Sequence, residues 1–198
     1  MIPVLSVTSI EDAKAFFTKK LPFADVGKNH LAYGEDVILL VQQDIWKNNH
    51  NITPYHFDHI AFKVIDLDSF AQKKQKQGLK LDANYTADGI TSIKEFWQEG
   101  VRFIFFKGPD NVPIEFCSQI DGSTTTKGID HLGVRTQNLD KAQKDFAHLE
   151  ARIIAEYQLD GDNNVCFFTA NNKMIEAFTA AGHNGMHNGL GWVGYIAQ

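Results

Sequence analysis

Two histidines and two glutamates stand out because each lies in a short, mostly apolar segment that is predicted to be a strand. His59 and His131 both follow an aspartate, and both belong to stretches with the period-2 alternation of a half-buried strand. Glu115 and Glu176 share their strand faces with few polar groups, the neighbours being Pro113 and Cys117, and Met174 and Phe178. A buried carboxylate in such surroundings is unfavourable unless it is paired or coordinates a cation. The pattern therefore predicts a charged partner or a bound cation for each glutamate.

The segments around the two histidines are copies of one repeated unit. After the strand that contains His59, Asp66 fits the N-cap of a helix, and Asn138 has the same place after the strand that contains His131. A third copy, without the histidine, begins at Ile2. Each helix is followed by three predicted strands, so we expect a repeat of one strand, one helix and three strands.

The repeat divides most of the chain into three units. In the first, Thr8 and Glu11 have the spacing of a capping box at the start of the helix. In the second, residues 79–85 are predicted to form the first strand after the helix. The predicted units cover residues 1–45, 56–119 and 129–180.

The tail, residues 181–198, is rich in glycine and asparagine at its start. From Gly189 onward it aligns with the segment that begins at Gly128, and Trp192 then stands in the place of His131. We interpret it as the remnant first strand of a fourth unit.

Composition limits the kind of protein. The chain has 198 residues, 43% apolar and 22% charged, as ordinary globular proteins do. Its net charge of −5 argues against nucleic acid as a partner, because nucleic-acid-binding proteins usually have a basic face. Apolar runs such as Val37 to Val41 are too short to span a membrane, and no signal peptide is evident. Cys117 and Cys166 do not make a disulfide framework, so we expect a cytoplasmic protein with no membrane partner.

The order and spacing of three motifs resemble the vicinal oxygen chelate superfamily over about residues 1 to 180. That superfamily includes glyoxalase I, the bleomycin- and fosfomycin-resistance proteins, methylmalonyl-CoA epimerase and the extradiol dioxygenases. The motifs are Asp58-His59-Ile60-Ala61-Phe62, Gly108-Pro109-Asp110-Asn111-Val112-Pro113-Ile114-Glu115-Phe116 and Asp130-His131-Leu132-Gly133-Val134. The resemblance implies an α+β fold in which tandem βαβββ units pair into cupped, barrel-like mixed sheets with the helices outside.

The resemblance also implies a metal site, because ligands in that superfamily come from the first and last strands of each unit. The matching positions here are His59, Glu115, His131 and Glu176. In the first unit the same positions fall on Ile2 and about Leu40, which cannot bind a metal. Two imidazoles and two carboxylates suit a divalent ion such as Zn, Ni, Mn, Co or Fe(II).

Which units pair decides whether the four residues meet. If the second and third units share a cup, all four converge. If the first and second units do, His59 and Glu115 face apolar residues, and the third unit must pair with a second chain or with the strand at Trp192. Three units leave one sheet without a partner, which predicts a homodimer.

The leading hypothesis is a metal-dependent enzyme that acts on a small oxygenated molecule as an isomerase, epimerase or lyase, or with Fe(II) as a ring-cleaving oxygenase. Glu176 or Glu115 would be the general base. Lys63 and Arg135 lie on the histidine faces, four residues further along, where they could meet an anionic substrate. Phe178 is a further candidate for substrate binding. The alternatives are a metal-free protein that sequesters a drug or metabolite, as bleomycin-resistance proteins do, and a structural role.

Overall fold

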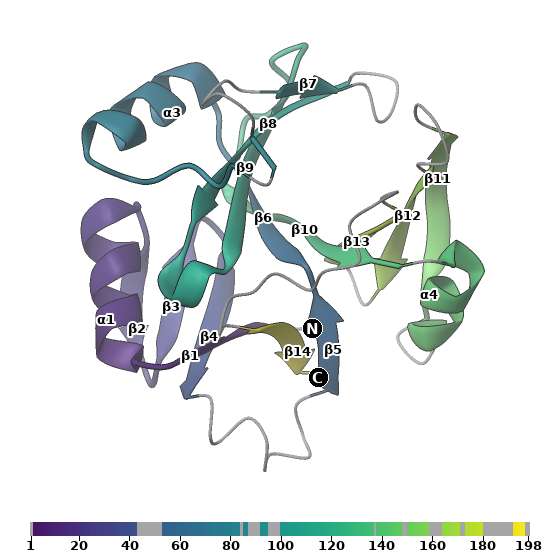
Figure 1. The fold of residues 1–198 in the computed structure, drawn as a ribbon, viewed down its shortest axis with the longest axis horizontal. Coiled ribbons are helices and arrows are strands. Elements are labelled where there is room, and N and C mark those ends of the chain that lie inside the picture. Colours follow the sequence, from purple (N-terminus) through teal and green to yellow (C-terminus); the bar gives the residue numbers. More distant parts are fainter. Residues whose placement is uncertain are drawn as a thin grey trace.

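The structure of the chain is a computed structural model, and its strands form two mixed sheets (Figure 1). It describes residues 2–42, 53–83, 85–86, 92–94, 100–136, 138–147, 150–158, 164–170, 173–179 and 192–196. The architecture is the α+β arrangement of strand–helix–strand units that the sequence predicts. In the described part of the chain, no helix has the length and apolar character needed to cross a membrane.

The smaller sheet has six strands in the order β2-β3-β4-β1-β14-β5. Its strands are β1 (Ile2–Val7), β2 (Ala24–Gly27), β3 (His30–Tyr33), β4 (Asp36–Gln42), β5 (Thr53–Phe57) and β14 (Trp192–Ile196). Side chains of β1 alternate between its faces. Leu5 and Val7 join the main core, whereas Val4 packs with Leu39 and Val41 on the other face.

The larger sheet has eight strands in the order β11-β12-β13-β10-β6-β9-β8-β7. Its second-unit strands are β6 (His59–Lys63), β7 (Ser92–Lys94), β8 (Val101–Lys107) and β9 (Pro113–Gln119). Its third-unit strands are β10 (Gly128–Arg135), β11 (Arg152–Gln158), β12 (Asn164–Ala170) and β13 (Lys173–Phe178). Within each unit the first strand runs parallel to the last, β6 beside β9 and β10 beside β13.

The two halves of the larger sheet join through the first strands of their units. β6 pairs antiparallel with β10, and Gly133 lies opposite His59 in this ladder. The second and third units therefore share one sheet, which is the arrangement that brings all four candidate ligands to the same face. The other pairing, of the first unit with the second through their first strands, does not occur, because β1 pairs with β4 and β14.

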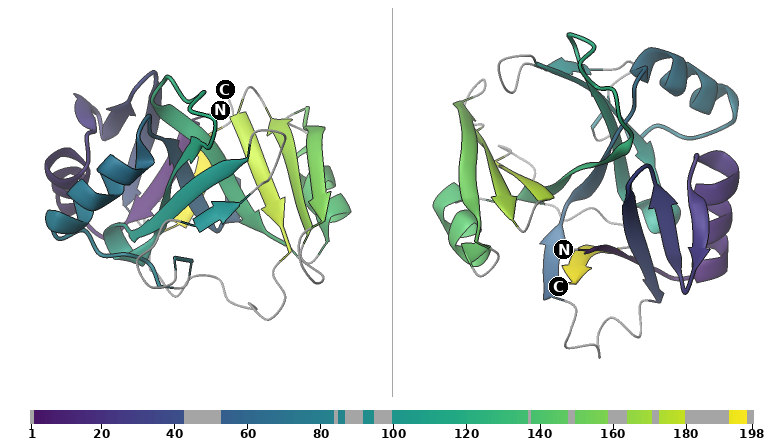
Figure 2. Two further views of the ribbon diagram at one scale, coloured as in Figure 1. Left: turned by 90° about the horizontal axis from the view of Figure 1, so that it is seen from above. Right: turned by 180° about the vertical axis from the view of Figure 1, so that it is seen from behind.

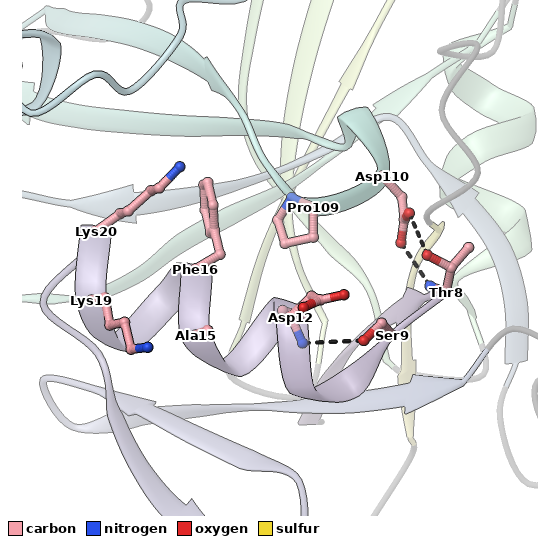
Figure 3. A pocket seen from close by; sticks show the side chains of 10 residues that line it. Thr8, Ser9, Asp12, Ala15, Phe16, Lys19, Lys20, Pro109 and Asp110 are labelled. Atoms are coloured by element: carbon pink, nitrogen blue, oxygen red, sulfur yellow. Dashed lines mark hydrogen bonds between the residues drawn. The ribbon is translucent and has the colours of Figure 1, made fainter.

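Among the described residues each unit has one α-helix, and two of the three predicted N-caps are confirmed. The helices are α1 (Ile10–Ala15), continued by a π-helical turn (Phe16–Lys20), then α3 (Leu67–Lys76) and α4 (Leu139–Asp145). The Asp66 and Asn138 side chains cap α3 and α4. The predicted cap at Thr8 is wrong, because Ser9 caps α1 by accepting from the Asp12 N–H. The Thr8 hydroxyl and N–H instead donate to Asp110, each at 2.7 Å (Figure 3).

The helix-covered faces of the first two units pack against each other in one apolar core. The Phe62 ring lies with its centroid 5.0 Å from that of Phe23 and 5.4 Å from that of Tyr33. The Tyr33 hydroxyl also donates to the backbone oxygen of Lys63, at 2.9 Å. α1 and α3 lie side by side at this junction, and α4 lies at the far end of the molecule (Figure 2).

The strand predicted at residues 79–85 is wrong. Only Leu81 makes a bridge there, to Phe106, and Asp82 N donates to Phe105 O at 2.9 Å. The strand that pairs with β8 on the side away from β9 is β7, at 92–94. The helical hydrogen bonds of Tyr85 and Thr86 to Asp82 O turn the chain away after Asp82, so a continuous ladder cannot form.

The end of the chain contributes a strand to the smaller sheet. β14 pairs antiparallel with β1, as β10 does with β6. In the sequence alignment Gly194 corresponds to Gly133, which lies opposite His59, and Ile2 corresponds to His59. Gly194 lies opposite Val4 and not Ile2, so the pairing of β14 with β1 is shifted by two residues. The rest of the tail, 181–191 and 197–198, lies outside the described residues. The homodimer was predicted because three units would leave one sheet without a partner. Since β14 and β5 extend that sheet, this reason no longer applies, and the homodimer stays a prediction.

Candidate metal centre

The four candidate ligands occupy equivalent places in the second and third units. His59 is the first residue of β6, and Glu115 of β9 lies beside the position two residues after it. His131 is the fourth residue of β10, and Glu176 of β13 again lies beside the position two residues after it. Because side chains alternate along a strand, each histidine and its glutamate project from the same face of the sheet.

Across the β6–β10 junction the four side chains converge. Nε2 of His59 lies 3.2 Å from Nε2 of His131. Glu115 Oε2 lies 3.1 Å from Nε2 of His59 and 3.3 Å from Nε2 of His131. Glu176 Oε2 lies 3.5 Å and 3.0 Å from the same two nitrogens. All four residues are buried, with exposed fractions of 2–6%.

These separations fit the ligand shell of a single ion. Ligands placed about 2.0–2.1 Å from a tetrahedral zinc lie about 3.3 Å from one another. The five nitrogen–nitrogen and nitrogen–oxygen distances above range from 3.0 to 3.5 Å. One ligand atom of each residue lies within 4.8 Å of all the others, so the cluster could hold a metal ion.

Each histidine is oriented by the aspartate that precedes it. Nδ1 of His59 lies 3.1 Å from Asp58 Oδ1, and Nδ1 of His131 lies 2.8 Å from Asp130 Oδ2. An imidazole that donates Nδ1–H to a carboxylate keeps a lone pair on Nε2, which here faces the cluster, and metal-binding histidines usually have such a partner. The sequence pattern that could have indicated this role for Asp58 and Asp130 is the repeated Asp-His dipeptide.

The charges of the cluster are strongly coupled. Burial by itself lowers the pKa of His59, but hydrogen bonds to Asp58, Glu115 and Glu176 raise that pKa to about 10. Burial also opposes protonation of His131, yet the two glutamates raise its pKa well above the usual value. Burial raises the pKa of each glutamate, but His131 and His59 lower both, that of Glu176 to about 2. Two imidazolium ions thus balance two carboxylates, and one divalent cation would balance them equally after two protons leave.

Asp58 belongs to a buried network that joins the second and third units. Its Oδ1 accepts a hydrogen bond from the Tyr85 hydroxyl at 2.8 Å, and its Oδ2 accepts one from Arg135 Nε at 3.1 Å. The Arg135 guanidinium also lies over the ring of Phe178, with Cζ 5.2 Å from the centroid. Arg135 Nη1 is buried and has no hydrogen-bond partner among the described residues. Arg135 and Phe178, both predicted to bind substrate, therefore lie together beside the His59 side of the cluster.

Lys63 lies toward the opposite end of the same face. It ends β6, four residues after His59, and pairs with Cys117 of β9. Burial raises the pKa of Cys117 well above its usual value, so this residue is a neutral thiol. Its Sγ donates to the backbone oxygen of Phe62 at 3.7 Å. Lys63 and Arg135 lie at opposite ends of the four-residue cluster, because Lys63 is opposite Gly128 in the β6–β10 ladder whereas His59 is opposite Gly133.

The first unit has no ligands at the equivalent positions. In the β1–β4 register Leu39 lies beside Val4, as Glu115 lies beside Ala61. Leu39, and not Leu40, therefore takes the place of Glu115. Leu40 projects to the opposite face and packs in the main core, because a shift of one residue along a strand reverses the face.

Comparison with solved structures identifies the fold. Glyoxalase I from Zea mays covers 97% of this chain and 70% of its own, with a TM-score of 0.62 and 14% sequence identity. A mutant of the same enzyme covers 96% and 70%, with a TM-score of 0.63 and 14% identity. Methylmalonyl-CoA epimerase from Mycobacterium tuberculosis covers 64% of this chain and 88% of its own, with a TM-score of 0.47 and 19% identity. No protein-family model and no curated protein matches the sequence. The chain therefore has the fold of the vicinal oxygen chelate superfamily, the group that its sequence motifs resemble.

Proposed function

We propose that this chain is a divalent-metal-dependent enzyme that acts on a small oxygenated organic molecule as an isomerase, epimerase or lyase. The observation that carries the proposal is the convergence of four buried ligand atoms, with both histidines oriented by aspartates. His59 and His131 would bind the ion through Nε2, and Glu115 and Glu176 through Oε2. Such a mixed nitrogen and oxygen set suits Zn, Ni, Mn, Co or Fe(II).

Besides the metal ligands, the side chains of the site include a candidate general base, apolar walls and a basic residue. A bound ion that accepted a substrate oxygen in addition to the four protein ligands would polarise a substrate carbonyl or a developing enediolate as a Lewis acid. One of the two glutamates, Glu115 or Glu176, would move a proton as general base. The rings of Phe105 and Phe178 flank the His59 ring at centroid distances of 5.0 and 5.8 Å and give the site apolar walls. Arg135, whose Nη1 is buried without a hydrogen-bond partner among the described residues, would add a positive charge beside the site.

The alternative function, a metal-free binding protein, would be preferred if the first and second units shared a cup. That condition is not met, because β6 pairs with β10 of the third unit. A ring-cleaving oxygenase would use the same ligands with Fe(II) and so is a variant of the metal-enzyme proposal.

Metal analysis of protein purified without chelator tests the proposal directly. We expect about one divalent ion per chain, retained through gel filtration. Reconstitution of chelator-treated protein with each of the five candidate metals in turn would then show which ion binds most tightly. A chain that retains none of these ions would refute the metal-enzyme proposal and favour the sequestering protein.

A further inference from the structure

One basic residue lies at each end of the cluster, at positions that the repeat relates to each other. Arg135 forms an ion pair with a carboxylate of the other unit, whereas Lys63 does not. Arg135 follows His131 by four residues and binds Asp58, which precedes His59. By the same relation, Lys63 follows His59 by four residues, and its counterpart is Asp130, which precedes His131. Lys63 and Asp130 form no ion pair within 4.0 Å, and no other carboxylate of the described residues pairs with Lys63.

A cavity of about 250 Å³ lies where the ion pair is missing. Its lining includes Lys63, Asp130, Cys117, Ser118 and the hydroxyl-rich segment 123–126. Thr124 is buried, and its Oγ1 accepts a hydrogen bond from Gln119 N at 2.8 Å, which holds this segment against β9. The cavity therefore combines an unpaired ammonium group with several hydroxyl donors.

The cavity opens on the same sheet face as the metal cluster. Cys117 lies two residues after Glu115 on β9, and Lys63 lies four residues after His59 on β6. At about 3.3 Å per residue, these positions lie about 7 Å and 13 Å from the ligand-bearing positions. Asp130 connects the two places, because it lines the cavity and holds Nδ1 of His131.

We propose that this cavity, the Lys63 pocket, binds the anionic end of the substrate, a carboxylate or phosphate group, while the oxygens that react lie at the cluster. The inference rests on the proposed function and adds the substrate class. The substrate would be a small acid or phosphate ester whose charge lies about 7–13 Å from its reacting oxygens. The ammonium of Lys63 would supply the charge and the hydroxyls the hydrogen bonds. Asp130 is the acidic group of the lining, and its carboxylate is already bound to His131.

Titration of the full-length protein with inorganic phosphate and, separately, with succinate tests the pocket without knowledge of the substrate. Amide NMR shifts should be largest for residues 117–126, and the dissociation constant should rise at higher ionic strength. Lys63→Met should weaken binding by about tenfold or more, and Lys63→Arg should restore most of it. Lys80→Met, at an exposed lysine outside the pocket, should bind like the unmodified protein. Tighter binding of phosphate or of succinate would show which group the pocket prefers.

Metal content measured on the same samples separates this inference from the proposed function. Lys63→Met should retain as much metal as the unmodified protein, because Lys63 is not a ligand. Equal anion binding by Lys63→Met and the unmodified protein, or shifts centred away from residues 117–126, would overturn the pocket and leave the metal centre standing. Anion binding at 117–126 in a chain that holds no metal would support the pocket and overturn the metal-dependent enzyme.

Discussion

Gly133 of β10 lies opposite His59 of β6, and a Cβ on Gly133 would lie 2.0 Å from Cε1 of the His59 ring. The ring cannot simply move aside, because it is buried against Phe105 and Phe178. The absence of a side chain at position 133 is therefore a condition for the place of His59 in the cluster.

Gly133→Ala should displace the His59 ring and lower both metal affinity and stability. We expect a loss of about 1–3 kcal/mol in the free energy of unfolding, as for other overpacked cores, measured by urea denaturation. The control is a double-mutant cycle with His59→Ala. When the ring is absent, the added methyl group should cost little, and an equal loss in both backgrounds would show that His59 is not the obstacle.

His131→Ala and Glu115→Ala should each abolish stable metal binding while the fold is kept, because either change removes one of four ligands from a buried site. Metal content per chain and far-UV circular dichroism are the two measurements. Glu156→Ala, at an exposed position of β11, is the matched control and should keep its metal. Full metal content in either ligand variant would exclude that residue as a ligand.

Metal affinity should rise with pH. In the metal-free protein the pKa of His59 is raised to about 10 and that of His131 is raised well above its usual value, so both protons must leave when an ion binds. Release of two protons makes affinity increase by up to about a hundredfold per pH unit below these pKa values. Competition titrations with a chelator at pH 6, 7 and 8 measure the slope. A pH-independent affinity, after correction for the chelator, would contradict this set of ligands.

The metal-free protein should lose stability at alkaline pH. A histidine pKa raised in the folded state contributes stability that is fully present below the unfolded value of about 6.5 and is lost as the pH rises through about 10. The pKa of Glu176 is lowered to about 2, so its contribution is present above about 4.5 and is lost as the pH falls through 2. Thermal unfolding of chelator-treated protein should show the highest contribution from the site between about pH 4.5 and 6.5. Added metal should remove most of the alkaline loss.

Arg135→Gln should weaken metal binding, although Arg135 is not a ligand. The change removes the Nε–H donor to Asp58, which orients His59, and loss of such outer partners typically lowers metal affinity by about 10- to 100-fold. Arg152→Gln, at an exposed position of β11, is the control. Unchanged metal affinity with a changed KM, once a substrate is known, would instead assign Arg135 to substrate binding alone.

Local patterns in the sequence were sufficient to predict which side chains share a face. The period-2 alternation places His59 with Ala61 and Lys63 on one face of its strand, because successive side chains of a strand point in opposite directions. By the same alternation, Glu115 shares a face of another strand with Pro113 and Cys117. The caps at Asp66 and Asn138 were also predicted, since an N-cap depends on the residues of one turn. At Thr8 the same reasoning failed, because Asp110, distant in the sequence, binds its hydroxyl.

Only the tertiary structure decided which strands meet. Apart from Pro3 of β1, which has no N–H, the edges of β1, β6 and β10 carry the same kinds of backbone donors and acceptors. Local sequence therefore cannot determine that β6 pairs with β10 while β1 pairs with β14. That choice brings His59 within 3.2 Å of His131, fixes the contact of Gly133 with the His59 ring and leaves the cavity beside Lys63. Tyr85, which holds Asp58, had no signal in the sequence, because its role depends on where a segment without regular strand structure lies against the sheet. Contacts between residues far apart in the chain follow from the packing of whole units, which no local pattern encodes.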